Sequence, residues 1–182
     1  MRLSECILDN DFIYLVRPFQ NIGSLCQALK RENITQLTEK EMRAGTYSIC
    51  QALNTIHSVG FLHGDVRPQH IFLHSVGKKM KIKLGEYDKC CPIEKKAEQQ
   101  PHDELNKVRL LYLAPEAICT QERGITPASE VWSLGVTLFV LATGCYPFAS
   151  AQEICEADLV WPTETILSHK FKLMITSMLQ KD

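Results

Sequence analysis

The feature that most constrains the fold is a long uncharged stretch near the C-terminal end of the chain. Between Val131 and Gln152 the sequence contains no Asp, Glu, Lys or Arg. About 20 apolar residues are enough to cross a bilayer, so the stretch either spans a membrane or is buried inside a globular domain. Polar and small residues interrupt it, and its apolar density falls after Ala142. We therefore predict a buried helix of a soluble domain, with Thr126 as its N-cap and Pro127 as its first residue.

The composition agrees with a folded, soluble domain. The chain has 182 residues, of which 45% are hydrophobic and 23% charged. These values exclude a disordered tail, a collagen-like repeat and a coiled-coil rod. Lys and Arg number 20 against 21 Asp and Glu, which gives a formal net charge of −1. Because there is no basic excess to neutralise phosphates, we expect neither nucleic acid nor a membrane surface as a partner.

Eight cysteines raise the question of disulfides or a zinc site. No Cys-x-x-Cys pair occurs, and the adjacent Cys90 and Cys91 suit neither a zinc knuckle nor an ordinary bridge. The N-terminal residues lack the positive and then apolar pattern of a signal peptide. We therefore expect scattered free thiols in the cytoplasm or another reducing intracellular compartment. A metal-binding alternative would add four histidines to the cysteine pair, namely His57, His63, His70 and His74.

Local patterns predict secondary structure in the first third of the chain. Residues 13–16 are β-rich and follow a turn, which predicts a strand, and residues 22–30 predict a short helix. Thr38 and Glu41 form a capping box, in which each side chain accepts a hydrogen bond from a free backbone amide of the other residue. The helix that begins there keeps its apolar spacing as far as Ser58.

Further elements are predicted beyond that helix. Two short apolar runs, residues 71–73 and 80–84, predict a β-hairpin. The polar residues 88–107 predict an exposed, mobile loop. A final amphipathic helix is expected after Pro162. Its apolar residues are Ile166, Leu167, Phe171, Met174, Ile175, Met178 and Leu179.

Five short motifs follow one another between residues 63 and 148. They are HGDVRP at 63–68, IKLGEYD at 82–88, YLAPE at 112–116, SEVWSLG at 129–135 and LATGCYPF at 141–148. In this order and at this spacing they resemble the large lobe of the protein-kinase fold, whose signature includes H-R-D, D-F-G and A-P-E. The resemblance implies an α+β protein-kinase-like fold with a mainly α-helical C-terminal lobe and a small β-hairpin.

The resemblance also implies a division of the chain. Residues 1–20 correspond to a remnant of the small-lobe sheet with the hinge, and residues 21–182 to a large lobe that is truncated at its C-terminal end. Most of the small lobe is absent from this sequence, so we expect exposed apolar surface around the hinge and the strand near Ile71. The hinge and gatekeeper positions, where the family binds nucleotide, are Arg17, Pro18 and Phe19.

Several catalytic positions of the family are changed in this sequence. Asp65 stands at the proton-acceptor position, and Arg67 replaces the catalytic-loop Lys. His70 and Glu86 stand at the two magnesium positions, where imidazole is a poor ligand for a hard cation and the longer carboxylate fits octahedral geometry less well. Arg17 at the gatekeeper position must find a carboxylate or block the adenine site, because a buried unpaired guanidinium is costly.

Other changes lie beside these positions. Gly64 replaces the Arg of H-R-D, and Val108-Arg109 replaces the Gly-Thr before A-P-E, so the usual Thr contact to the catalytic Asp is lost. Glu130 stands for the Asp that ties down the catalytic-loop backbone. The resemblance assigns structural roles to His63, Glu116, Glu130 and Trp132.

Together these changes predict a divergent, catalytically impaired pseudokinase that acts as a protein-binding or scaffold module. ATP and Mg²⁺ are the family's cofactors, and we expect none for this chain beyond weak nucleotide binding. The expected partner is a protein. The alternative is a Ser/Thr protein kinase that transfers phosphate from ATP to protein when a longer form supplies the small lobe.

Overall fold

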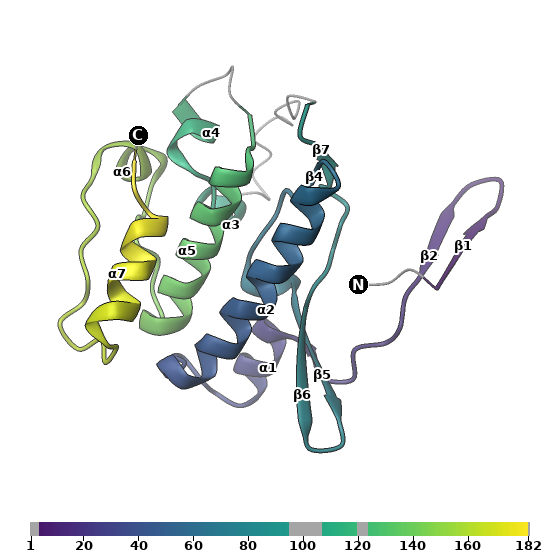
Figure 1. The fold of residues 1–182 in the computed structure, drawn as a ribbon, viewed down its shortest axis with the longest axis horizontal. Coiled ribbons are helices and arrows are strands. Elements are labelled where there is room, and N and C mark those ends of the chain that lie inside the picture. The colour runs from purple at the N-terminus through teal and green to yellow at the C-terminus, as the bar shows by residue number, and fades with distance from the viewer. Residues whose placement is uncertain (1–3, 95–106, 120–123, 182) are drawn as a thin grey trace.

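A helical body and a projecting β-hairpin make up the structure, a computed structural model that describes residues 4–94, 107–119 and 124–181. Two long helices, α2 (Glu39–Ser58) and α5 (Pro127–Thr143), lie side by side at the centre of the body (Figure 1). The last helix, α7 (His169–Met178), packs against the opposite side of α5. The short helix α6 (Ala151–Glu156) lies near the C-terminal end of the chain.

Local capping chemistry sets the ends of the two long helices. The hydroxyl of Thr38 accepts a hydrogen bond from the Glu41 amide, and the Glu41 carboxylate accepts one from the Thr38 amide, so the predicted capping box is confirmed. Thr126 caps α5, and Pro127 is its first residue, as predicted. Gly144 ends α5 in the left-handed conformation with φ 75°, which glycine adopts without steric cost.

The uncharged stretch forms the core of the body. Along α5, Trp132 is only 2% exposed and stacks on Phe148, with ring centroids 5.8 Å apart. Gly135 allows α7 to approach closely, because a Cβ at this position would lie 2.9 Å from the Cβ of Met178. No helix among the described residues is both long and apolar enough to cross a membrane. The prediction of a buried helix is therefore confirmed for residues 127–143, and the rest of the stretch forms a loop and part of α6.

Small antiparallel sheets support the helices. The predicted hairpin is present as β5 (Ile71–Val76) and β6 (Lys79–Leu84), and β3 (Gly23–Ser24) adds to the β5 side. A second pair joins β4 (Phe61–Leu62) to β7 (Cys91–Pro92). The loop that carries the candidate catalytic residues begins directly after β4, so the pairing of β4 with β7 holds that end of the loop.

Three predicted boundaries are wrong. Helix α1 (Leu25–Arg31) begins at the N-cap Ser24 because Gly23 and Ser24 pair with β5 instead. Helix α7 begins at His169, where Ser168 supplies the N-cap, so Ile166 and Leu167 lie before the helix. The polar stretch 88–107 is not loop throughout, since it contains β7 and the first residue of α3 (Lys107–Leu110). Its residues 95–106 are outside the part of the chain that is described.

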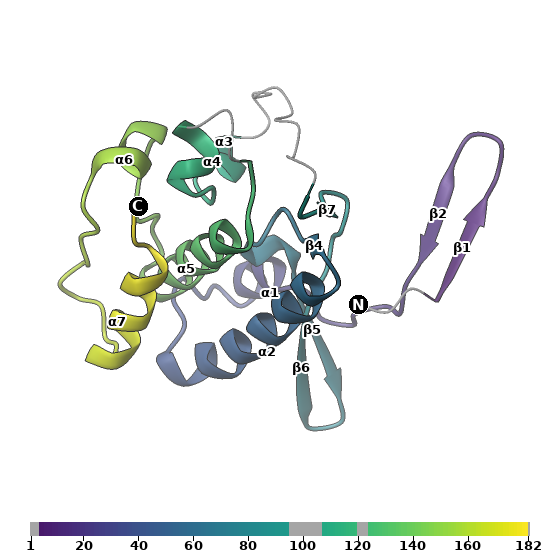
Figure 2. The ribbon, with the colours of Figure 1, turned by 45° about the horizontal axis from the view of Figure 1, so that its top comes forward.

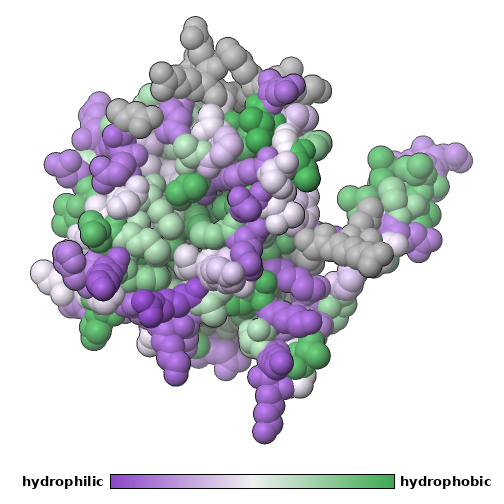
Figure 3. Space-filling model, in the orientation of Figure 1, coloured by the Kyte–Doolittle hydropathy of each residue, from purple (hydrophilic) through white to green (hydrophobic). Residues whose placement is uncertain are grey.

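The hairpin of β1 (Glu5–Leu8) and β2 (Ile13–Val16) stands away from the helical body (Figures 1 and 2). The predicted strand 13–16 is confirmed, although its partner strand was not foreseen. Every residue of both strands is exposed, and apolar side chains cover much of the hairpin surface in Figure 3. Phe19, in the hinge, is 83% exposed, whereas Ile71 is only 4% exposed because it packs into the core. The expected apolar exposure is therefore present around the hinge, whereas on the strand near Ile71 it is limited to Val76, at the end of β5, which is 49% exposed.

One disulfide contradicts the expectation that all the cysteines are free. It joins Cys119, at the end of α4 (Pro115–Cys119), to Cys155 in α6. The two helices pack against each other, which brings together thiols that lie 36 residues apart in the sequence. The other cysteines are free, namely Cys6, Cys26, Cys50, Cys90, Cys91 and Cys145.

Candidate active site

The candidate catalytic loop runs from β4 to a 3-10 turn, Pro68–His70, that leads into β5. His63 is fully buried within this loop, and its Nε2 lies 2.8 Å from the Gly85 carbonyl oxygen. Its Nδ1 accepts a hydrogen bond from the Asp65 amide at 3.3 Å. Burial lowers the pKa of His63, which favours the neutral ring that this pattern of one donor and one acceptor requires. His63 therefore joins the loop to the start of the 85–88 segment.

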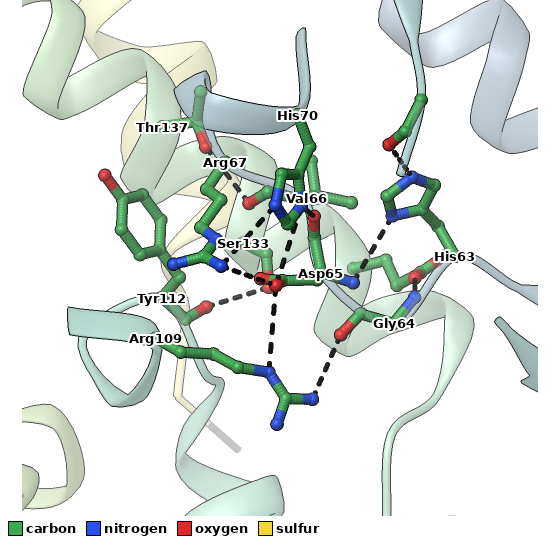
Figure 4. A network of polar contacts seen from close by, with 12 residues as sticks. His63, Gly64, Asp65, Val66, Arg67, His70, Arg109, Tyr112, Ser133 and Thr137 are labelled. Atoms are coloured by element: carbon green, nitrogen blue, oxygen red, sulfur yellow. Dashed lines mark hydrogen bonds and ion pairs between the residues drawn. The ribbon is translucent and has the colours of Figure 1, made fainter. Parts of the chain in front are cut away.

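The Asp65 carboxylate is surrounded by two guanidinium groups and an imidazole ring of its own chain (Figure 4). Its Oδ2 lies 3.0 Å from an Arg67 Nη, 3.5 Å from His70 Nδ1 and 4.0 Å from Arg109 Nε. Only 5% of the side chain is exposed. A general base must accept a proton from the substrate hydroxyl, and this oxygen is already engaged by the chain itself.

His70 has both ring nitrogens directed at neighbouring groups. Its Nδ1 lies 2.9 Å from the backbone oxygen of Asp65, an arrangement in which this nitrogen donates. Its Nε2 lies 3.5 Å from an Arg67 Nη, which leaves it as the acceptor. Neither nitrogen points to an open coordination position, and imidazole suits a hard oxygen-preferring cation poorly in any case.

Glu86 forms an ion pair with Arg17. The Oε1 atom lies 3.1 Å from an Arg17 Nη, across a separation of 69 residues in the sequence. The two side chains are 38% and 32% exposed, so solvent partly screens the pair. Of the two outcomes expected for Arg17, the structure shows the carboxylate partner. Glu86 has a positive φ of 59°, a conformation that non-glycine residues adopt rarely.

These donors do not fit a magnesium ion. At the two magnesium positions, the Glu86 carboxylate faces a guanidinium group, and His70 offers imidazole where the ion prefers oxygen. Across residues 4–94, 107–119 and 124–181, no group of three or more His, Cys, Asp or Glu side chains is placed to hold a metal ion. The same finding covers the histidine and cysteine set of the metal-binding alternative.

Arg109 is a site residue whose position sequence reasoning missed. From α3, it donates a hydrogen bond from a terminal nitrogen to the Gly64 carbonyl oxygen at 3.3 Å and directs its Nε toward Asp65. The loss of the usual Thr at this point was recognised in the sequence, but the new contact was not. Gly64 itself has φ 83°, and a Cβ there would lie 2.3 Å from the Lys89 carbonyl oxygen, so only glycine fits.

Side chains of helix α5 form hydrogen bonds with the backbone of the candidate catalytic loop. Glu130 is 2% exposed, and its Oε1 accepts a hydrogen bond from the Gly64 amide at 2.5 Å. Its Oε2 lies 2.7 Å from His57 Nε2. Thr137 donates from its hydroxyl to the Val66 carbonyl oxygen at 3.2 Å. The position of the loop therefore depends on polar side chains from within the core helix.

The remaining predicted site residues lie apart from this cluster. Pro18 is exposed, and its carbonyl oxygen accepts a hydrogen bond from the Gln20 side chain at 2.7 Å. Phe19 is largely exposed, and Trp132 belongs to the core. Glu116 is half-buried in α4. The structure thus brings together Asp65, Arg67, His70, His63 and Glu130. Glu86, which pairs with Arg17, follows the end of β6 by two residues.

The helical body, the small hairpins and the loop that carries Asp65 define a protein-kinase-like fold. Residues 1–182 match the family described as protein kinase domain, and the chain belongs to this family. It is 27% identical to the cell cycle serine/threonine-protein kinase CDC5/MSD2 of Saccharomyces cerevisiae, over 98% of this chain and 25% of that protein. It is 29% identical to human serine/threonine-protein kinase ULK3, over 100% of this chain and 38% of that protein.

A third relative differs in its description. The STE20-related kinase adapter protein strd-1 of Caenorhabditis elegans is 28% identical, over 85% of this chain and 39% of that protein. The chain therefore spans less than two fifths of the length of these relatives.

Proposed function

We propose that this chain is a catalytically impaired kinase-like domain that acts as a protein-binding or scaffold module. The observation that carries the proposal is that both carboxylates at catalytic positions are engaged by guanidinium groups of the same chain. Asp65 faces Arg67 and Arg109, and Glu86 faces Arg17. Each carboxylate is thereby occupied where an active kinase would present it to a substrate hydroxyl or to a metal ion.

Electrostatics supports the proposal. Phosphoryl transfer depends on positioning and on neutralising the charge that spreads over the phosphate oxygens, and the metal ions supply several kcal/mol of that stabilisation. The donors around His70 and Glu86 do not suit Mg²⁺, so we propose that the chain requires neither ATP nor Mg²⁺. The relative strd-1 is named as an adapter protein, which is in keeping with a binding role for this chain.

The test measures thermal unfolding of the purified chain with ATP alone, with Mg²⁺ alone and with both. We expect the melting temperature to be the same with ATP and Mg²⁺ together as with ATP alone. The matched variant combines Arg17→Met, His70→Asn and Glu86→Asp, which removes the cation and restores the family's metal-binding side chains. A shift that requires Mg²⁺ in the wild-type chain would contradict the proposal.

The second candidate is a Ser/Thr protein kinase, and the retained Asp65 is the observation that favours it. Under this alternative, a longer form of the protein would transfer phosphate from ATP to a protein hydroxyl. Asp65→Asn would abolish that transfer, and Arg109→Ala would increase it by removing one of the two guanidinium groups that face the carboxylate. Transfer at a rate that Asp65→Asn does not change would have to come from a contaminating kinase, and would give this candidate no support.

A further inference from the structure

The β1–β2 hairpin has two faces of different character. In an antiparallel pair, side chains of directly paired residues lie on the same face, and successive residues of a strand alternate between the faces. The pairing of Cys6 with Leu15 and of Leu8 with Ile13 therefore defines one face, which we call the aliphatic face. All four side chains are apolar, so this face carries no charged group at neutral pH.

The opposite face is more polar and less exposed. It carries the pairs Glu5–Val16 and Ile7–Tyr14, so it includes a carboxylate and a phenol. Its three apolar residues are 40–47% exposed, whereas the two leucines and the isoleucine of the aliphatic face are 61–70% exposed. Because the hydrophobic gain grows with the apolar area removed from water, the aliphatic face gains more from a partner.

The helical body does not cover the aliphatic face. The hairpin projects away from the body in both ribbon views, and it is connected to the body through the residues that follow β2 (Figures 1 and 2). A two-stranded hairpin alone is only marginally stable in water and gains stability when one face is packed. Neither strand contains the Lys or Pro with which exposed strands often avoid association. These features favour a covering surface from another molecule.

A second copy of the chain fits the aliphatic face by charge and by area. When this face meets itself, no like charges approach each other, whereas a charged partner surface would lose hydration and gain no ion pair. At roughly 100 Å² of exposed surface for each of the four side chains, two such faces bury about 800 Å² in total. Stable interfaces bury at least about 1,200 Å², so a dimer of this size should be weak and should dissociate on dilution.

We propose that the chain forms a weak two-fold dimer in which the aliphatic faces of two β1–β2 hairpins pack against each other. A two-fold interface uses the same patch on both copies, which this self-compatible face allows. The proposal does not rest on impaired phosphoryl transfer, because the hairpin contains none of the residues around Asp65.

Analytical ultracentrifugation of the purified chain, from about 5 μM to about 500 μM, tests the dimer. We expect a reversible monomer–dimer equilibrium with a dissociation constant on the order of 100 μM. Ile13→Lys puts a charge on the aliphatic face and should weaken the dimer about tenfold or more. Tyr14→Lys is the matched control, because it adds the same charge to the opposite face and should change the dissociation constant by less than about twofold. A chain that stays monomeric over this range overturns the proposal, as does a dimer that Ile13→Lys leaves unchanged.

Cross-linking at Cys6 gives a second test that needs no charge on the hairpin. Cys6 is a free, exposed thiol on the aliphatic face, so a bismaleimide of short span should join the Cys6 thiols of two copies. Cys6→Ser should remove the cross-linked dimer. Cys50→Ser and Cys145→Ser are the controls, since both thiols are exposed on the helical body, and each variant should still cross-link. Cross-linking that survives in Cys6→Ser but is lost in either control would place the interface on the body and overturn the proposal.

Discussion

Replacing Glu130 by Ala should be among the most destabilising single changes in this chain. The carboxylate is buried in α5 and accepts hydrogen bonds from the Gly64 amide at 2.5 Å and from His57 Nε2 at 2.7 Å. A hydrogen bond to a charged group contributes about 1.5–3 kcal/mol. Removing one partner of a buried pair costs about 3–5 kcal/mol, because the groups left behind lose their solvation and their partner. We therefore expect a loss of about 4 kcal/mol in the free energy of unfolding.

The assay is urea unfolding at pH 7, followed by circular dichroism and analysed for the midpoint and slope. Glu130→Gln keeps an acceptor for the Gly64 amide and should lose about half as much as Glu130→Ala. Glu164→Ala removes an exposed carboxylate and serves as the control, with a change within about 0.5 kcal/mol. The reasoning is refuted if Glu130→Ala costs less than about 1 kcal/mol, or if Glu130→Gln is as harmful as Glu130→Ala.

Three further predictions concern other parts of the fold. Gly45→Ala should stabilise α2 by up to about 1 kcal/mol in thermal unfolding, because the new Cβ would meet only Ile82 Cδ1 at 3.4 Å; a lower melting temperature would mean that this side chain cannot yield. Reducing the Cys119–Cys155 bridge should cost up to about 4 kcal/mol in urea unfolding, the chain-entropy value for its loop; dithiothreitol should then leave Cys155→Ser unaffected. Burial lowers the pKa of His63, so its contribution to stability is complete above pH 6.5 and is lost as the pH falls toward the folded-state pKa. Unfolding free energies measured between pH 7.5 and pH 5 should therefore fall more steeply for wild type than for His63→Gln, by up to about 1.4 kcal/mol per pH unit, and parallel profiles would contradict this.

Helix starts with strong local signals could be predicted from the sequence. Thr38 and Thr126 cap their helices through hydrogen bonds to residues three positions away, so the whole signal lies within one short window. Pro162 and the apolar spacing after it predict an earlier start for α7 than His169, where the helix begins. The N-cap Ser168, which accepts a hydrogen bond from the Phe171 amide, carried the correct signal.

Contacts between distant segments were harder to predict. The positions of Asp65, Arg67 and His70 on one loop follow from their closeness in sequence. The approach of Arg109 to Gly64 spans 45 residues, and no periodicity or spacing in the sequence encodes it. The Cys119–Cys155 bridge has the same cause, since it depends on how α4 and α6 pack. For Arg17, sequence reasoning gave two outcomes, a carboxylate partner or a blocked adenine site, and could not identify Glu86 as the partner.

The Arg17–Glu86 ion pair has a consequence for how this chain can change over evolutionary time. A return of Glu86 to Asp draws the carboxylate back by one methylene and leaves the guanidinium of Arg17 poorly matched. A loss of Arg17 alone leaves Glu86, already at a positive φ, without its cation. Residues in contact show non-additive effects, so each substitution alters the cost of the other. A metal-binding site at this position would therefore require Arg17 and Glu86 to change together, in addition to a change at His70.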